Sequence, residues 1–143
     1  MRLAAVALLS ALMIAPAYAQ TAAAPAFTTV SSEAFSANPG GAVLVDVREP
    51  SEWAQTGMPK GSLGISVSRP DFVAEVLKAT GGDKSKPVAV ICRSGARSVK
   101  AANALVEAGF TNVTNVGDGW IGREGVGSGW GASKLPTQLA PPN

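Results

Sequence analysis

The chain has 143 residues, of which 46% are hydrophobic and 15% charged, and its formal net charge is +2. This size suits one domain with its own core, and the nearly balanced charge offers no basic surface for nucleic acid. The sequence contains no histidine and a single cysteine, Cys92. Cys–His pairs, Ser–His–Asp triads, imidazole metal sites and an intramolecular disulfide are therefore excluded.

The N-terminal residues have the pattern of an export signal. Arg2 is followed by a nearly unbroken apolar run from Leu3 to Ala15, and a small-x-small cleavage motif ends at Ala19. The run is too short for a comfortable membrane span. We expect a signal peptide over residues 1–19 and a periplasmic or secreted mature protein without a membrane span. A retained N-terminal anchor is the alternative.

The rest of the chain alternates strand and helix patterns. We expect a linker over 20–26, one domain over 27–137 and a flexible tail over 138–143. Strands are predicted over 27–30, 42–47, 61–67, 87–92 and 112–116. Helices are predicted after Ser31 or Ser32 through Phe35, from Pro50 to Gly57, and over 71–79 and 97–108.

These patterns predict an α/β fold. The run from Ala42 to Val47 is apolar except for Asp46, which is typical of a strand buried on both faces of a parallel sheet. Gly109 is placed to form the left-handed cap of the helix over 97–108. Strands that alternate with helices imply right-handed crossovers. We therefore expect a mostly parallel central sheet of about five strands with helices on both faces.

The most informative stretch surrounds the single cysteine. The apolar strand that ends at Ile91 leads directly into Cys92-Arg93-Ser94-Gly95-Ala96-Arg97-Ser98, where the helix pattern begins. This arrangement places a thiol at the carboxyl end of a buried strand. Loop amides, a helix N-terminus and arginines there favour a thiolate nucleophile. A small, inert core cysteine is the alternative.

Two other strand ends are polar or glycine-rich, at Asp46-Val47-Arg48 and at Gly117-Asp118-Gly119. Because the carboxyl ends of parallel strands meet at one edge of a sheet, we expect a single site there. Four residues separate Cys92 from Arg97, whereas cysteine phosphatases of the tyrosine-phosphatase type have five, which wrap a tetrahedral oxyanion. The shorter loop suits an outer sulfur atom on the cysteine, so a phosphatase or arsenate reductase is disfavoured.

Three segments, in the same order along the chain, resemble the rhodanese-like family. The segment from Cys92 to Ser98 resembles its active-site loop, the residues from Asp46 to Trp53 resemble the motif after its second strand, and those from Gly109 to Gly119 resemble its closing segment. The similarity covers residues 27–120. The glycine-rich stretch 121–131, together with the following Leu135-Pro136, resembles exported single-domain members.

The resemblance implies a thiosulfate sulfurtransferase that works through a Cys92 persulfide, without metal or cofactor. The sulfur donor would be thiosulfate or a similar small molecule, and the acceptor cyanide or a thiol. A catalytically weak binding module, or a sulfur carrier that serves a protein partner through residues 121–131, is the alternative. The implied site comprises Cys92 as the catalytic residue, Arg93, Ser94, Gly95, Ala96 and Arg97 in substrate binding, and Asp46, Arg48 and Ser98 as supporting residues.

Several of these roles have stated alternatives. Arg97 is expected to orient the loop and the anionic donor, with a structural ion pair as the alternative, and Arg93 is either a donor-binding or a solvated surface residue. Asp46 and Arg48 are expected to tie their strand end to the cysteine loop. Asp118 stands where the family often has a second glycine, and its charge is expected to discourage anionic donors. Met58 stands where the family often has a histidine, and we expect weaker local support of its loop. Packing in the core or at its rim, rather than substrate contact, is expected for Trp53, Trp120 and Trp130.

Overall fold

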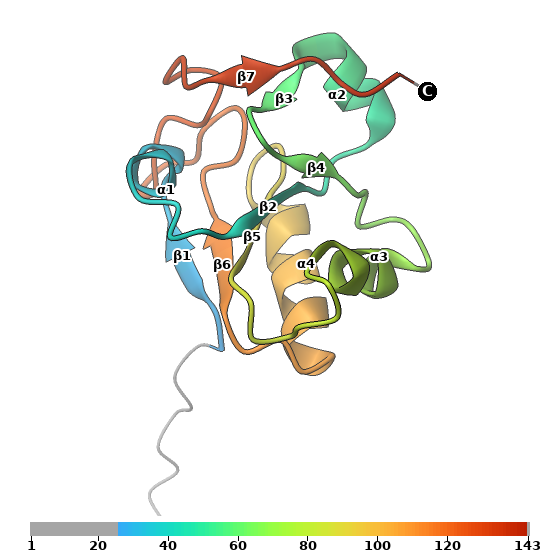
Figure 1. Cartoon of the computed structure of the whole chain (residues 1–143). Coiled ribbons are helices and arrows are strands. Elements are labelled where there is room, and N and C mark those ends of the chain that lie inside the picture. Colours follow the sequence, from blue (N-terminus) through green and yellow to red (C-terminus); the bar gives the residue numbers. More distant parts are fainter. Residues whose placement is uncertain (1–25, 143) are drawn as a thin grey trace, which may run out of the picture.

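The computed structural model describes residues 26–142 (Figure 1). The predicted signal peptide, and the predicted linker except Ala26, lie outside these residues. The elements in chain order are β1 (Thr28–Val30), α1 (Ser32–Ala37), β2 (Val43–Asp46), α2 (Pro50–Thr56), β3 (Met58–Pro59), β4 (Leu63–Gly64), α3 (Phe72–Ala79), β5 (Val88–Ile91), α4 (Ala96–Glu107), β6 (Val113–Val116) and β7 (Thr137–Gln138).

Five strands form one sheet in the order β1-β6-β5-β2-β4, and all of its neighbouring strands are parallel. β3 and β7 form a separate antiparallel pair. The expected α/β fold with a mostly parallel five-stranded sheet is therefore confirmed. Because β5 lies in the middle of the sheet, the residue that follows it, Cys92, emerges at the centre of the carboxyl edge.

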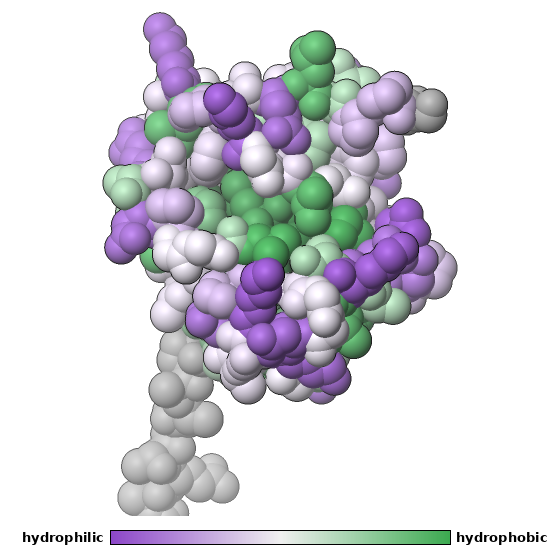
Figure 2. All heavy atoms as spheres, viewed as in Figure 1, coloured by the Kyte–Doolittle hydropathy of each residue, from purple (hydrophilic) through white to green (hydrophobic). Residues whose placement is uncertain are grey.

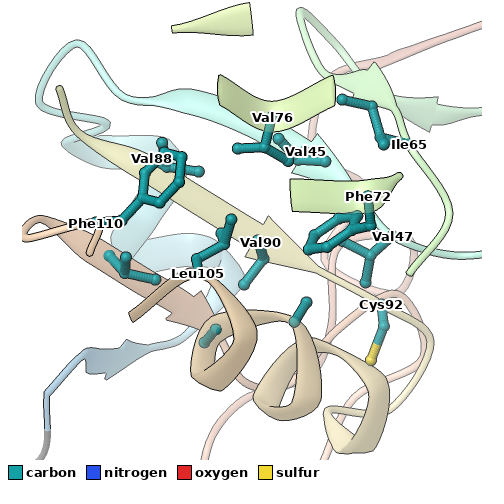
Figure 3. Packing of buried hydrophobic residues seen from close by; sticks show 13 residues of the cluster. Val45, Val47, Ile65, Phe72, Val76, Val88, Val90, Cys92, Leu105 and Phe110 are labelled. Atoms are coloured by element: carbon teal, nitrogen blue, oxygen red, sulfur yellow. The ribbon is translucent and has the colours of Figure 1, made fainter. Parts of the chain in front are cut away.

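Two apolar clusters cover the two faces of the sheet. On one face, side chains of β2 and β5 pack against α3 and α4, for example Val90 against the layer that contains Phe72 and Leu105 (Figure 3). On the other face, Phe35 of α1 and Trp130 pack with Ala89 and Ile91 of β5. All four residues of β5 are buried. Burial on both sides explains why this strand is a continuous apolar run.

The helix ends follow their sequence signals. Ser31 caps α1 by accepting the Ala34 amide at 3.2 Å. Gly109, with φ of 97°, ends α4 in the left-handed conformation, and the Phe110 amide then donates to the Leu105 carbonyl at 3.0 Å. These caps satisfy backbone groups that would otherwise lack a partner at the helix ends.

The third predicted strand, over 61–67, is mostly irregular, and β4 is reduced to two residues. Beyond Gly64, local bonds compete with strand pairing: the Ser68 amide donates to Ser66 Oγ at 3.1 Å, and both hydroxyls donate to the Glu49 carboxylate. The Ile65 and Val67 amides still donate to the Asp46 and Val47 carbonyls, both at 3.1 Å, so the segment stays beside the carboxyl edge of β2 without forming a regular strand.

The pair of β3 and β7 was not predicted. Gln138, which sequence patterns placed in the tail, belongs to β7 and fastens the chain end to the turn before β4. Its side chain accepts from the Gly61 amide at 2.7 Å and donates to the Ser62 carbonyl at 2.9 Å. The C-terminal segment is thus joined to the domain through residue 138.

On the face shown in Figure 2, apolar side chains gather in the middle, over β2 and β4, and polar and charged side chains surround them. Leu63 of β4 is one of the large hydrophobic residues exposed at the surface. Among residues 26–142, no helix has the length and apolar character needed to cross a membrane.

Candidate active site

Cys92 directly follows β5 and is 1% exposed. Its Sγ accepts the Gly95 amide at 3.0 Å and lies 3.4 Å from Ser98 Oγ. Figure 3 shows the side chain directed towards the first turn of α4. The Ser98 hydroxyl in turn donates to the Gly95 carbonyl at 3.1 Å, so that the loop closes on itself around the sulfur.

Gly95 is the residue that gives this loop its shape. Its φ is 102°, a left-handed conformation that side chains disfavour, and it is the N-cap of α4. A Cβ at this position would lie 2.5 Å from the Gly117 carbonyl oxygen. The bare backbone therefore lets the amide face the sulfur. Together with the N-terminus of α4, this amide places positive partial charge where a thiolate would carry its negative charge.

The other loop positions differ in exposure. Arg93, Ser94 and Ala96 are exposed, whereas Gly95 and Ser98 are buried. The loop therefore presents three residues to an incoming molecule and keeps two against the sulfur. Their assignment to substrate binding and support stays a prediction.

Arg97 forms an ion pair with Glu52 of α2. Its two terminal nitrogens lie 2.6 and 2.8 Å from the two carboxylate oxygens, and both side chains are partly buried. The hydrogen bonds from Arg97 lower the pKa of Glu52 from its ordinary 4.5 to about 2, and the same bonds raise the pKa of Arg97. The structure thus contains the structural ion pair, which joins α4 with α2. A role of Arg97 in binding the donor stays a prediction.

Because of this ion pair, the free energy of unfolding is expected to depend on pH. Because the pKa of Glu52 is lowered by folding, the stabilisation is complete above pH 4.5 and is lost as the pH falls towards about 2. We expect the wild type to lose about 1–2 kcal/mol more than Glu52→Gln across this window, after allowance for solvent screening. Urea unfolding at a series of pH values measures this difference, and parallel curves for the two proteins would contradict it.

Asp46 and Arg48 form a buried pair at the end of β2. Arg48 is 1% exposed, and its Nη2 lies 2.7 Å from the Asp46 carboxylate, which also accepts from Nε. The remaining donors reach Thr56 Oγ1 and the Gly57 carbonyl, both at 2.9 Å, and the guanidinium lies 4.6 Å from the centroid of the Trp120 ring.

The expected link from this pair to the cysteine loop is therefore indirect. Arg48 binds the C-terminal end of α2 and the Trp120 ring, whereas the loop is reached through the backbone of Trp120, whose amide donates to the Cys92 carbonyl at 2.9 Å. The Arg48 side chain is long enough to contact residues beyond the end of β2. The two-residue spacing of Asp46 and Arg48 in the sequence does not reveal these partners.

The glycine-rich C-terminal segment forms a wall of the site. Besides the Trp120 bond, the Ile121 amide donates to the Arg93 carbonyl at 3.0 Å. Gly119 lies so close to the loop that a Cβ there would be 2.5 Å from the same carbonyl oxygen. The segment therefore continues the site beyond the point where the sequence motifs end.

The prediction for Asp118 is wrong. Asp118 is fully buried, and its carboxylate accepts the Ser32 amide and hydroxyl, both at 2.8 Å, and the Gly129 amide at 2.9 Å. These donors come from segments 86 and 11 residues away. The side chain therefore fastens the C-terminal segment to α1 and does not carry charge to the mouth of the site. Met58 is likewise a fully buried residue of β3.

A second carboxylate near the site was not predicted. Glu49 accepts hydrogen bonds from Ser68 Oγ at 2.6 Å and from Ser66 Oγ at 2.7 Å, which lower its pKa. Its amide also donates to Glu52 at 2.9 Å, so the two carboxylates belong to one network beside Arg97. Within residues 26–142, no three histidine, cysteine or acidic side chains gather as metal ligands would.

Comparison with known proteins points to one family. The family model described as "Rhodanese-like domain" matches residues 32–122. Thiosulfate sulfurtransferase 16 of Arabidopsis thaliana is 35% identical over 103 residues, which cover 66% of this chain and 78% of that protein. Thiosulfate sulfurtransferase GlpE of Pseudomonas syringae is 38% identical over 80 residues, which cover 56% and 70%.

Solved structures agree with this result. Rv0390 from M. tuberculosis superposes with a TM-score of 0.60 at 32% identity, covering 79% of this chain and 98% of that one. The polysulfide-sulfur transferase from Wolinella succinogenes superposes with a TM-score of 0.59 at 28% identity, covering 80% of each chain. The chain belongs to the rhodanese-like domain family.

Proposed function

We propose that the protein is a sulfurtransferase that moves a sulfane sulfur from thiosulfate or a similar donor to a thiol, or to cyanide in an assay, through a persulfide on Cys92. The observation that carries the proposal is the Cys92 sulfur at the end of β5, held in a short loop and facing the Gly95 amide at 3.0 Å. Relatives named thiosulfate sulfurtransferases support the donor class.

In the first half-reaction, the Cys92 thiolate attacks the outer sulfur of thiosulfate. A bond forms between the two sulfur atoms, the bond from the outer sulfur to the sulfonate breaks, and sulfite leaves with the bonding electron pair. The Gly95 amide and the N-terminus of α4 stabilise the attacking thiolate. The same donors then face the persulfide anion.

In the second half-reaction, a thiolate or cyanide attacks the outer sulfur of the persulfide. The new bond carries this sulfur away, and the electron pair of the broken sulfur–sulfur bond returns to Cys92 as a thiolate. Ser98 supports both steps through its hydroxyl, which lies 3.4 Å from the sulfur and donates to the Gly95 carbonyl. Cys92 is 1% exposed, which favours small donors and acceptors.

The first 19 residues add a proposal about location. The apolar run and the cleavage motif that ends at Ala19 support export to the periplasm or out of the cell. N-terminal sequencing of the protein purified from the envelope fraction of its host tests this proposal. A mature chain that begins at Gln20 is the expected result, and an intact Met1 in the cytosolic fraction would contradict it.

Steady-state turnover tests the proposed reaction. With thiosulfate and cyanide, the wild type is expected to release sulfite and thiocyanate in equal amounts, whereas Cys92→Ser releases neither above background. Ser51→Ala, a change of similar size at an exposed residue of α2, is the control and should retain full activity.

Other outcomes assign the protein elsewhere. If the wild type accepts one sulfur from thiosulfate but releases it only to a partner protein, the sulfur-carrier alternative replaces the enzyme. If it hydrolyses an aryl phosphate and takes up no sulfur, the phosphatase reading replaces both. Equal turnover by the wild type and Cys92→Ser would remove Cys92 from the mechanism.

A further inference from the structure

Arg123, in the glycine-rich segment after β6, lies next to the cysteine loop. It is an exposed residue, yet its side chain lies back against the loop, with Nη1 3.0 Å and Cδ 3.5 Å from the position that a Cβ on Gly95 would occupy. Gly95 is the residue whose amide donates to the Cys92 sulfur. A guanidinium therefore lies beside Gly95, the residue whose amide contacts the reacting sulfur.

The backbone that carries Arg123 is held in place. Its amide donates to the Gly127 carbonyl at 2.9 Å, and its carbonyl accepts the Gly127 amide at 3.1 Å, which closes a tight turn. Before this turn, the Ile121 amide is bonded to the Arg93 carbonyl, and after it the Gly129 amide is bonded to the buried Asp118 carboxylate. The turn is thus fastened to the loop on one side and to the core on the other.

The distribution of charge distinguishes Arg123 from the other arginines near the site. Arg48 is bound to Asp46 and Arg97 to Glu52, so the charge of each of these two guanidiniums is paired with a carboxylate. In the part of the chain that the structure describes, neither Arg93 nor Arg123 takes part in an ion pair. Of these two, Arg123 is the one whose guanidinium is seen against Gly95. Its positive charge thus lies beside the cysteine loop and is not paired with a carboxylate of the described residues.

We propose that Arg123 binds the anionic end of the sulfur donor and determines the preference of the site for oxyanion-bearing donors. The inference rests on the proposed function and names a specificity residue for it. The planar guanidinium offers two parallel N–H groups to two oxygens of a sulfonate, a geometry that a single amide cannot supply. The sulfonate becomes sulfite when the outer sulfur is transferred, so the same contact serves the donor and the leaving group.

The test compares Arg123→Gln with Arg123→Lys and with Lys100→Gln, which removes an equal charge from an exposed position on α4. Turnover is measured as a function of thiosulfate concentration at low and high salt. Arg123→Gln is expected to raise KM for thiosulfate at least about tenfold, the effect of losing its charge-assisted hydrogen bonds, and to change kcat by less than about twofold. Arg123→Lys should recover part of the loss, because the charge remains without the planar fork.

A second donor sharpens the result. Methanethiosulfonate transfers its outer sulfur and releases methanesulfinate, and it carries one negative charge where thiosulfate carries two. Arg123→Gln should therefore raise KM for methanethiosulfonate less than KM for thiosulfate. The salt dependence of KM for thiosulfate should also weaken in this variant, since an ion–ion contact has been removed.

The outcomes separate the two proposals. If the wild type turns over thiosulfate and Arg123→Gln has the KM of Lys100→Gln, the role of Arg123 is wrong and the sulfurtransferase stands. If kcat and the thermal midpoint fall together with the affinity, Arg123 only holds the loop and the inference is also wrong. If the wild type neither takes up sulfur nor turns over, both proposals fail.

Discussion

Replacing Gly95 with alanine is expected to lower the free energy of unfolding by about 2–3 kcal/mol and to reduce sulfur transfer at least about a hundredfold. The residue has φ of 102°, and the added Cβ would lie 2.5 Å from the Gly117 carbonyl oxygen. Relief of this clash moves the Gly95 backbone, and the amide that faces the Cys92 sulfur moves with it. Stability and activity should therefore fall together.

Gly82→Ala is the matched control for this change. Gly82 also has a positive φ, of 84°, but a Cβ there meets nothing within 4 Å. Its alanine variant should lose only about 1 kcal/mol, the cost of the backbone conformation, and keep its activity. Urea unfolding and thiocyanate release measure the two effects. Equal losses in both variants would show that the close approach at Gly95 is unimportant.

Removal of the Asp46 carboxylate is expected to destabilise the fold by about 3–5 kcal/mol. Asp46→Ala leaves the Arg48 guanidinium 1% exposed and without its counter-charge. The Arg48 charge left behind is buried and cannot be hydrated. The free energy of unfolding therefore falls by more than the ion pair contributes in the wild type. Chemical unfolding of the variant measures this loss directly.

An exposed pair serves as the control for the buried one. Arg69 and Asp71 have the same two-residue spacing and a similar 2.8 Å contact, but their side chains are 49% and 50% exposed. Asp71→Ala should therefore leave the free energy of unfolding nearly unchanged. The double variant Asp46→Leu with Arg48→Met should be more stable than Asp46→Ala. If Asp46→Ala and Asp71→Ala lower the free energy of unfolding equally, burial does not determine how much each ion pair contributes to stability.

The sheet and its main helices could be predicted because each depends on a local pattern. The run from Val88 to Ile91 is apolar throughout because β5 is buried on both faces, and Gly109 ends α4 because the chain there needs a left-handed residue. β3 and β7 have two residues each, too few for any periodicity. Their pairing depends on contacts of Gln138 with residues 61 and 62 that no local pattern encodes.

The position of the thiol could also be predicted, because Cys92 directly follows the apolar central strand. Gly95, three residues later, marks the loop that turns back to the sulfur. The partners of the charged residues could not. Glu52 meets Arg97 across 45 residues. Asp118 was expected at the mouth of the site, but its donors are supplied by Ser32 and Gly129 in the core.

Arg123 was missed for a related reason. It lies in a glycine-rich stretch without periodicity, and its approach to the cysteine loop depends on the hydrogen bond from Ile121 to Arg93. The seven glycines between residues 117 and 131 were a usable signal, because glycine often marks a close approach of two backbones. That signal indicates a contact but does not identify its partner.

Intact mass spectrometry of the protein treated with thiosulfate tests the central claim most directly. The wild type should gain the mass of one sulfur atom, Cys92→Ser should gain none, and cyanide should remove the added atom from the wild type as one equivalent of thiocyanate. This result follows from a thiolate at Cys92, the single cysteine of the chain. A wild type that gains no sulfur, or a Cys92→Ser variant that gains as much as the wild type, would contradict the account.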